Sequence, residues 1–284
     1  MWNILKNQKN ILTIDVEDWF TDLNYKYWDR FKDTIVHNVE LILKILKENN
    51  AAATFFIVGY FAKKYPELVE KIFEANHEIG SHGYNHIAIS DLSPEQFEKD
   101  LIESKIIIEK IIGEKIWGYR APFFTITEET SWAITTLKNN HFKYDSSVFP
   151  FKIYKYGIPN APTFPYRISL ENIKKIDNNE SFLEFPLSTY KIPFIRKNIP
   201  IAGGFYLRFF PLKFITYAIK SINKKNHPAI IYTHPWEFNP NNPRINLIVW
   251  YNYYRLNTTE KKFRKLLNDF KFTSIRDWIE NEIL

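Results

Sequence analysis

The stretch NILTIDVEDWF, residues 10–20, opens the first structural unit that can be recognised in this chain. Residues 10–16 are largely apolar and β-branched, which predicts a buried strand with acidic side chains at its end. Residues 35–48, IVHNVELILKILKE, place apolar side chains three and four positions apart, which predicts an amphipathic helix. A second buried strand is expected over residues 52–58, AATFFIV. This order of strand, helix and strand is typical of a parallel sheet whose strands are joined by helices.

The same alternation continues to the end of the chain. We expect further helices over residues 62–75, 94–112, 128–139, 211–224, 259–269 and 275–283, and strands over residues 77–80, 115–120, 142–144, 229–233 and 272–273. The motif Ser93-Pro94-Glu95-Gln96 predicts that a helix begins at residue 94, because it is a capping box with proline at the first helical position. The alternation predicts an α/β protein, and we favour a barrel of fewer than eight parallel strands.

One region does not follow this pattern. Residues 150–211 hold 8 of the 15 prolines together with many aromatic residues. We interpret this region as a long insertion at the barrel mouth of a single domain that spans residues 1–284. Its aromatic side chains could form one wall of a sugar groove or pack the insertion onto the barrel. Gly203-Gly204 would allow close approach of a ligand or form a tight turn.

The composition restricts the possible functions. The chain has no cysteine, so disulfides and thiolate metal sites are excluded, and any metal must be bound by histidine and carboxylate. No apolar run is long enough for a membrane span or for the core of a signal peptide, and we expect a cytoplasmic protein. The net charge of +6 favours an anionic partner such as an acidic glycan, a nucleotide-sugar or a membrane surface. We expect no nucleic-acid partner, because the basic residues are spread along the chain.

Histidines follow one of the predicted strands, at the sheet edge where the reactive groups of α/β proteins gather. His82 and His86 are four residues apart, so one side of a helical turn would present both imidazoles to one divalent ion. With a carboxylate from another strand end they would form a two-histidine, one-carboxylate site of the kind that holds catalytic zinc. A solvated or hydrogen-bonded histidine pair is the alternative.

Three acidic residues, Asp15, Glu17 and Asp18, lie at the end of the first strand. One of them could bind the metal while a second takes a proton from the metal-bound water. Alternatively, Glu17 or Asp18 caps the following turn. At the ends of later strands, Arg120 would orient the base and His234 is a candidate general acid.

A general acid of this type needs a carboxylate that holds its tautomer and its pKa. Asp145 is the candidate partner of His234. The alternatives are a surface position for Arg120 and a core or edge position for His234.

The order of these motifs resembles the polysaccharide deacetylase family, also called the NodB-homology family or carbohydrate esterase family four. The motifs are Thr13-Ile14-Asp15 with Asp18, His82-Gly83 with His86, Arg120 with Pro122-Phe123, Asp145, and Thr233-His234. They run in the order of the family from Leu12 to about Trp236. The stretches at residues 15–20 and 203–208 are most similar to deacetylase-like proteins encoded beside exopolysaccharide and exosortase loci.

The resemblance implies a distorted (β/α) barrel of about seven parallel strands and a zinc-dependent, or other divalent-metal-dependent, removal of acetyl groups from N-acetylated sugars. It assigns the catalytic base to Asp15, its support to Arg120 and the general acid to His234, with Asp145 as partner of the acid. It makes His82 and His86 metal ligands. It also places the backbone N–H of Phe123 in the oxyanion hole.

The chain departs from the family pattern at two positions. The family commonly has adjacent aspartates, whereas Val16 follows Asp15 here, so the carboxylate ligand is Asp18, which we prefer, or Glu17. Gly83 stands where serine or threonine is commoner, so a hydroxyl hydrogen bond is lost. Some relatives with altered aspartates have lost the metal or act on other amide-like bonds, which leaves inactivity or a cyclic-imide substrate as alternatives.

We therefore expect a metal-dependent hydrolase that removes N-acetyl groups from a sugar in an oligo- or polysaccharide, such as a cell-wall, capsule or exopolysaccharide glycan or its precursor. Trp19, Tyr84 and Trp236 lie beside the motif residues and are candidates for the rim that binds the sugar. The alternatives are an amidohydrolase that acts on a small amide or on a nucleotide- or lipid-linked sugar, and an inactive glycan-binding protein.

Overall fold

The computed structural model describes residues 8–152, 156–192 and 197–282. The chain divides into two compact units, each with its own strands and helices. Unit 1 takes its residues from the stretches 1–55, 74–78 and 201–284. Unit 2 takes its residues from 56–73 and 79–200.

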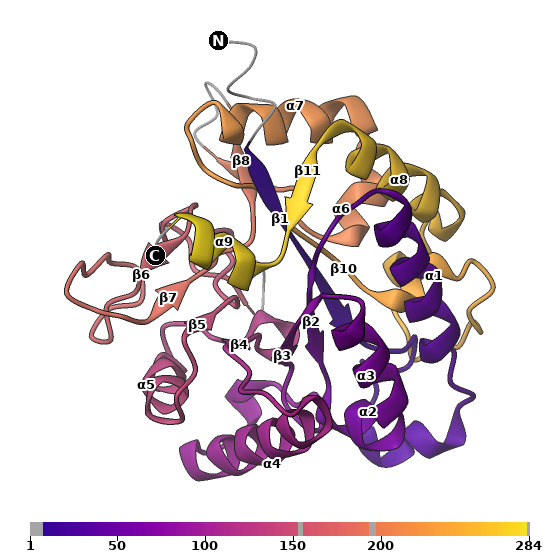
Figure 1. The fold of residues 1–284 in the computed structure, drawn as a ribbon, viewed down its shortest axis with the longest axis horizontal. Coiled ribbons are helices and arrows are strands. Elements are labelled where there is room, and N and C mark those ends of the chain that lie inside the picture. Colours follow the sequence, from indigo (N-terminus) through magenta and orange to yellow (C-terminus); the bar gives the residue numbers. More distant parts are fainter. Residues whose placement is uncertain (1–7, 153–155, 193–196, 283–284) are drawn as a thin grey trace. The chain divides into compact units, whose positions relative to one another are not determined.

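The strands of unit 1 are parallel and lie side by side in Figure 1. β1 (Lys9–Val16) pairs with β10 (Ile230–Thr233) and with β11 (Lys271–Thr273). After its first residue every residue of β1 is buried, as expected for a strand of a parallel sheet with both faces covered. The predicted strands at the two ends of the chain are therefore confirmed.

The helices of unit 1 are α1 (Ile35–Glu48), α6 (Gly204–Phe209), α7 (Leu212–Asn223), α8 (Thr259–Asp269) and α9 (Ile275–Glu282). α1 and α8 have the predicted bounds, because their apolar positions recur at helical spacing. The last residue of the predicted final helix, Ile283, lies outside the described residues. Unit 1 also contains short 3₁₀ helices, η1 (Tyr25–Arg30), η4 (Pro235–Phe238), η5 (Trp250–Tyr253) and η6 (Leu256–Thr258).

Unit 2 contains a second run of parallel strands. They pair in the order β3 (Glu78–Ser81), β4 (Gly118–Tyr119), β5 (Tyr144–Asp145) and β7 (Leu183–Glu184), with β6 (Tyr166–Arg167) antiparallel to β7. β2 (Thr54–Ile57) has residues in both units, and β8 (Thr189–Lys191) pairs antiparallel with β9 (Asn198–Pro200). In register, Ser81, Tyr119, Asp145 and Glu184 form one row across four strands. The residues after this row lie at one edge of the sheet.

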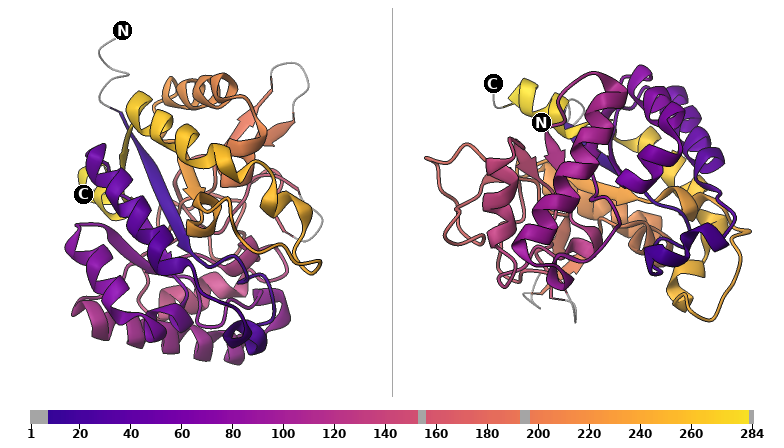
Figure 2. Two further views of the ribbon diagram at one scale, coloured as in Figure 1. Left: turned by 90° about the vertical axis from the view of Figure 1, so that its right-hand side faces the viewer. Right: turned by 90° about the horizontal axis from the view of Figure 1, so that it is seen from below.

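The helices of unit 2 are α2 (Gly59–Lys64), α3 (Pro66–Glu74), α4 (Pro94–Ile112) and α5 (Trp132–Asn139), with 3₁₀ helices η2 (Ile89–Asp91) and η3 (Pro122–Phe124). α4, the long magenta helix in Figure 2, confirms the predicted capping box. Ser93 Oγ accepts from the backbone N–H of Gln96 at 3.3 Å, and the Gln96 side chain accepts from the Ser93 N–H at 2.9 Å. α4 ends at Gly113, which has φ = 74°.

Most predicted elements differ from the structure by a residue or two at their ends, and three differ more. The helix expected over residues 62–75 is two helices, because Pro66 has no N–H to donate and disfavours a helical conformation at Tyr65. The strand expected over 115–120 has only two residues, and α5 begins at Trp132 instead of Glu128. These differences shorten elements but do not change their order.

The Pro-rich region at residues 150–211 contains β6–β9 and α6. β7 extends the parallel sheet of unit 2, since Tyr144 pairs with Leu183 and Asp145 pairs with Glu184. Residues 153–155 and 193–196 of this region lie outside the described residues. That the whole chain is one domain, with this region at the barrel mouth, stays a prediction.

The alternation of helices and mostly parallel strands confirms the α/β class. None of the described helices combines the length and the apolar character that a bilayer span requires.

Candidate active site

The end of β1 and the end of β10 carry the candidate acid and base of unit 1. Because these parallel strands pair Ile14 with Thr233, the residues that follow lie at the same sheet edge. Asp15, Glu17 and His234 form a group whose possible ligand atoms lie within 4.8 Å of one another. Asp15 and Glu17 are 1% and 5% exposed, so their charges are largely shielded from water.

His234 lies between two carboxylates. Its Nε2 is 3.9 Å from Glu17 Oε1, and its Nδ1 is 3.5 Å from Glu237 Oε2. Burial alone would lower the pKa of His234. The surrounding carboxylates, with Glu17 first among them, outweigh burial and raise the pKa of this histidine to about 9. The ring can therefore carry a proton at neutral pH, as a general acid must.

Glu237 is buried and accepts from several groups at once. Its Oε2 accepts from the Thr233 hydroxyl at 2.6 Å and from the His234 backbone N–H at 3.0 Å, while Oε1 accepts from Arg208. Burial would raise the pKa of Glu237, but the charge of Arg208 and these hydrogen bonds lower it to about 2. The side chain beside His234 is therefore a stable carboxylate.

Arg208 is fully buried and held by more than Glu237. Its Nε donates to the carbonyl oxygen of Tyr254 at 2.7 Å and its Nη2 to that of Tyr251 at 3.2 Å. The ring of Trp236 stacks on His234, with 5.2 Å between centroids and 18° between planes. Arg208, Glu237 and Trp236 thus fix the orientation of the His234 ring.

Asp18 lies at the N-terminus of α1. Its carboxylate accepts from the backbone N–H groups of Trp19, Thr34 and Ile35 at 2.8, 2.6 and 2.9 Å, and from the Thr34 hydroxyl at 2.7 Å. Glu17 belongs to groups of described residues that could hold a metal ion, whereas Asp18 belongs to none of these groups. Both oxygens of Asp18 already accept hydrogen bonds at this helix terminus, which favours Glu17, and the choice of carboxylate ligand stays a prediction.

Trp19 is only 5% exposed. Its indole N–H donates to the Lys32 carbonyl oxygen at 3.2 Å, and its ring contacts Phe20 and Phe31. Trp19 packs inside unit 1, which leaves it little surface for a sugar.

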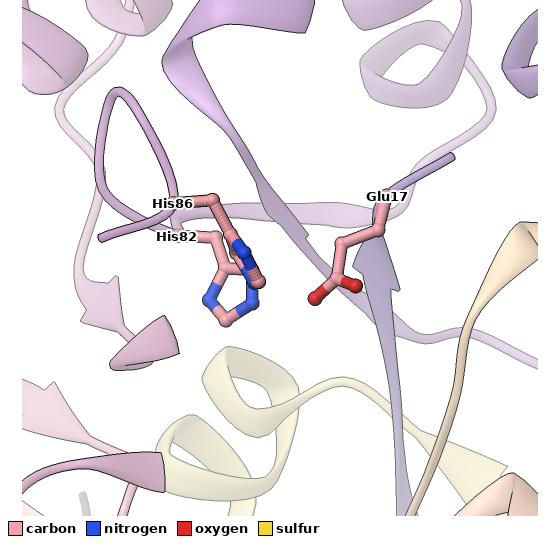
Figure 3. Close-up of side chains that lie close together, drawn as sticks. All are labelled: Glu17, His82 and His86. Carbon is pink, nitrogen blue, oxygen red and sulfur yellow. The ribbon is translucent and has the colours of Figure 1, made fainter. Parts of the chain in front are cut away.

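In unit 2, His82 and His86 have neighbouring rings, with 5.0 Å between centroids. Figure 3 shows both imidazoles on the same side of the loop that carries them, and it also draws Glu17, which directly follows β1. The expected helical turn is a loop instead, since Gly83 and His86 have φ values of 70° and 52°. His82 Nδ1 is 2.7 Å from the carbonyl oxygen of Arg120. When Nδ1–H donates to this carbonyl, Nε2 is the unprotonated ring nitrogen, as a metal ligand requires.

The loop between the two histidines is held by Asp100 of α4. Its carboxylate accepts from the backbone N–H groups of Tyr84 at 2.7 Å and Asn85 at 3.2 Å. A Cβ on Gly83 would lie 3.0 Å from Asp100 Oδ2, and its left-handed backbone also favours glycine. The half-buried Tyr84 ring covers Gly59, where a Cβ would lie 2.6 Å from Tyr84 Cδ2.

Phe123 lies directly against this loop. Its ring contacts the His86 ring with 4.5 Å between centroids, and 36% of its surface is exposed. Phe123 and Phe124 both have φ = 55°, which is rare for bulky residues and is found where local structure imposes it. The oxyanion role of its N–H stays a prediction.

Arg120 is completely buried and donates to Ser146. Its Nε reaches the Ser146 carbonyl oxygen at 2.8 Å and its Nη2 reaches Ser146 Oγ at 2.7 Å. Its guanidinium also lies 4.4 Å from the centroid of the Phe56 ring. These contacts rule out a surface position, the alternative for Arg120.

Asp145 belongs to a buried acidic pair of unit 2. Its oxygens accept from Ser147 Oγ at 2.6 Å and from the Ser147 N–H at 3.1 Å, and its side chain is hydrogen-bonded to Glu184. Burial, together with the adjacent Asp145, raises the pKa of Glu184 well above its usual value. Burial also raises the pKa of Asp145 to about 6. The pair therefore shares a proton at weakly acidic pH.

Sequence reasoning missed Glu237, Arg208 and Glu184. The signal for Glu237 is present in Thr233-His234-Pro235-Trp236-Glu237, where proline opens a turn that returns the glutamate to the His234 backbone. Arg208 and Glu184 follow no such local pattern, because their partners are distant along the chain.

The donors present suit a divalent ion such as zinc. Two neighbouring imidazoles, one with its tautomer set by a backbone carbonyl, are ligands that zinc commonly takes, and catalytic zinc sites often add a carboxylate.

Two parts of the chain match known family models. Residues 27–141 match the family model described as polysaccharide deacetylase, and residues 146–280 match a domain of unknown function, DUF3473. A peptidoglycan-N-acetylglucosamine deacetylase of Bacillus cereus is 38% identical over 64 residues, 22% of this chain and 30% of that protein. A peptidoglycan deacetylase of Helicobacter pylori is 32% identical over 107 residues, 38% of this chain and 36% of that protein. Each match spans about a third of the relative.

A solved structure confirms the fold. It is a Mycobacterium smegmatis protein assigned to the polysaccharide deacetylases, with a TM-score of 0.65, 20% identity, and coverage of 97% of this chain and 91% of that chain. The predicted distorted (β/α) barrel of NodB-homology type is thereby confirmed, whereas the exosortase-locus resemblance stays a prediction. Of the predicted motifs, those at His82, His86, Arg120 and Phe123 lie within residues 27–141, the part that matches the polysaccharide deacetylase model.

Proposed function

We propose that the protein is a metal-dependent hydrolase that removes N-acetyl groups from N-acetylated sugars of an oligo- or polysaccharide. The observation that carries the proposal is the pairing of a histidine, His234, with carboxylates on both of its ring nitrogens at the end of two parallel strands. A deacetylase needs such a proton donor, because the leaving sugar nitrogen must be protonated.

By the motif pattern, the metal would be held by His82 and His86 together with a carboxylate that follows β1, for which we propose Glu17. Asp18 is less suited, because its carboxylate accepts from backbone N–H groups at the start of α1. Bound zinc would lower the pKa of a coordinated water to about 7 and polarise the acetamide carbonyl. Another divalent ion with a similar preference for nitrogen and oxygen ligands would serve the same purpose.

Asp15 would accept the proton from the attacking water as the C–O bond forms. The backbone N–H of Phe123 would donate to the oxyanion, a role consistent with its strained backbone. His234 would then give its proton to the sugar nitrogen as the C–N bond breaks, which leaves acetate and a free amine. Arg120, held by Ser146, would orient the base.

Glu237 takes the role that we had assigned to Asp145. Its fixed negative charge would stabilise the protonated ring of His234, and Arg208 would hold that carboxylate in place. Asp145 instead belongs to the buried pair with Glu184.

Acetate release from N-acetylated chitooligosaccharides and from peptidoglycan fragments tests the proposal. Wild-type protein loaded with zinc should release acetate, and this release should stop when a chelator removes the metal. Asp15→Asn should lose at least about 100-fold in kcat while keeping its zinc, because a base contributes that much or more. The control Asp269→Asn changes an exposed aspartate of α8 and should behave as wild type.

Two outcomes would refute parts of this account. Normal turnover by Asp15→Asn would remove Asp15 as the base. A zinc-loaded wild type that binds these glycans and releases no acetate would instead identify a glycan-binding protein.

A further inference from the structure

Unit 1 exposes a group of large apolar side chains on its surface. Leu247 is 77% exposed and Trp250 is 68% exposed, and Phe209, Tyr251 and Val249 are each 44–48% exposed. We define the aromatic surface as these residues and the rings that they contact. Its members are Phe205, Phe209, Phe210, Leu247, Val249, Trp250, Tyr251 and Tyr254.

The aromatic surface is continuous. Trp250 contacts Tyr251 and Tyr254, each with 6.0 Å between ring centroids. Phe205 contacts Tyr251 at 5.7 Å and Phe209 at 5.7 Å, and the chain of contacts continues through Phe210. Segments some forty residues apart in sequence therefore contribute to one patch. In both views of Figure 2, the gold segment that holds residues 244–255 is an outward loop.

The backbone beneath this surface is fixed. Arg208 donates to the carbonyl oxygens of Tyr251 and Tyr254, which anchors the loop to α6. Lys262 Nζ donates to the carbonyl oxygens of Leu207, Arg208 and Phe210 at 2.8–3.0 Å, at the end of α6. These bonds hold the backbone that carries Tyr251, Tyr254 and Phe210.

Most charged residues in the stretch that supplies the aromatic surface are cationic. Residues 201–259 contain seven lysines and arginines and one acidic residue, Glu237, which is buried against Arg208. Lys213, Arg244 and Arg255 are exposed in this stretch, and Arg255 lies 5.9 Å from the centroid of the Tyr254 ring. Asp22, whose carboxylate accepts from Asn252, adds one negative charge. Arg244, which lies 5.6 Å from the Tyr253 ring centroid, and Arg255 therefore add positive charge beside the apolar side chains.

We propose that the aromatic surface binds the interface of an anionic lipid bilayer. Tryptophan and tyrosine rings prefer the level of the lipid head groups, and exposed aliphatic side chains such as Leu247 and Val249 gain by entering the acyl region. The cations attract anionic head groups at the same time. A sugar would stack on the aromatic rings but would leave Leu247 and Val249 without a partner.

Co-sedimentation of the full chain with vesicles tests the proposal. We expect binding to vesicles of equal parts phosphatidylcholine and phosphatidylglycerol, and much weaker binding to phosphatidylcholine alone. The variant Leu247→Ser/Trp250→Ser should bind at least about tenfold more weakly, because it removes two large apolar groups from the contact. Ile106→Ser, which changes a 59% exposed residue of α4, is the matched control and should bind as wild type.

The charge of the surface is tested separately. Lys213→Glu and Arg244→Glu should each weaken binding to the anionic vesicles by about fivefold or more. Added salt should weaken the binding of wild type, because it screens the same charges. Lys99→Glu on α4 is the control. Absence of wild-type binding, or binding that Leu247→Ser/Trp250→Ser leaves unchanged, would overturn the proposal. Light scattering could instead show a wild-type dimer that Leu247→Ser/Trp250→Ser disrupts, with no binding to vesicles. This result would identify a second copy of the chain as the occupant of the surface and would also overturn the proposal.

Discussion

Gly204 makes room for the carboxylate of Glu237. A Cβ built on residue 204 would lie 1.7 Å from Glu237 Oε2, which is far inside van der Waals contact. We had interpreted Gly203-Gly204 as a close approach to a ligand or as a tight turn. The structure gives a different reason at Gly204, because the close approach is made by a buried side chain of the protein itself.

Gly204→Ala should therefore displace Glu237 from His234. We expect a loss of at least about tenfold in kcat, as for other changes that disturb the partner of a catalytic group. Acetate-release kinetics measure this loss. Gly113→Ala is the control, since nothing lies within 4 Å of its Cβ position, and it should lower stability without lowering kcat. Equal activity of Gly204→Ala and Gly113→Ala would contradict the role of Gly204.

Glu237→Gln keeps the size of the side chain and removes its charge. We expect kcat to fall by about 10- to 100-fold while KM changes little, because the charge stabilises His234 and does not bind the sugar. Steady-state kinetics separate the two parameters. Glu260→Gln on α8 is the matched control. A rise in KM with unchanged kcat would place Glu237 in substrate binding instead.

The buried pair of Asp145 and Glu184 predicts a pH-dependent stability. Both groups have a pKa above the ordinary value in the folded protein, so the folded state binds more protons than the unfolded state. The raised pKa values therefore add to the unfolding free energy in full at pH values below the ordinary pKa values, and this stabilisation is lost as pH rises. For Asp145 the loss occurs between pH 3.8, its ordinary pKa, and about pH 6.

Urea unfolding at several pH values tests this relation. Glu184→Gln stays neutral and relieves Asp145 of its acidic neighbour, so its unfolding free energy should fall less with rising pH than that of wild type. Glu171→Gln, at an exposed position, should keep the wild-type slope. Identical slopes for Glu184→Gln and wild type would show that the pair does not share a proton.

The capping box of α4 predicts a local stability effect. Ser93→Ala removes the hydroxyl that accepts from the Gln96 N–H and should lower the unfolding free energy by about 1 kcal/mol. Ser90→Ala in η2 is the control, with an expected effect below about 0.5 kcal/mol. A negligible effect of Ser93→Ala in urea unfolding would show that the box does not stabilise the fold.

The elements that could be predicted from sequence are those with a local cause. α1 and α8 follow from helical spacing of apolar residues, and the start of α4 follows from its capping box. β7 could not be predicted, because a strand of two residues shows no periodicity and is defined by its pairing with β5.

The same distinction applies to the site. His82, His86 and His234 follow predicted strands and Arg120 ends one, so the sheet-edge rule indicates all four. The choice between Glu17 and Asp18 depends on Thr34, sixteen residues away from Asp18, whose backbone and hydroxyl bind the Asp18 carboxylate. The partner of His234 depends on a turn that brings Glu237 back to it. Such contacts are fixed by tertiary structure and leave no spacing signal.

The most direct test of the central claim is the zinc content of wild type, Glu17→Gln and Asp18→Asn, measured by elemental analysis after purification without chelator and dialysis against zinc. We predict about one zinc per chain in wild type, loss of zinc in Glu17→Gln, and retention in Asp18→Asn, which should be less stable because α1 loses its carboxylate cap. A folded Asp18→Asn without zinc beside a Glu17→Gln that keeps it, or a wild type that binds none, would contradict the account.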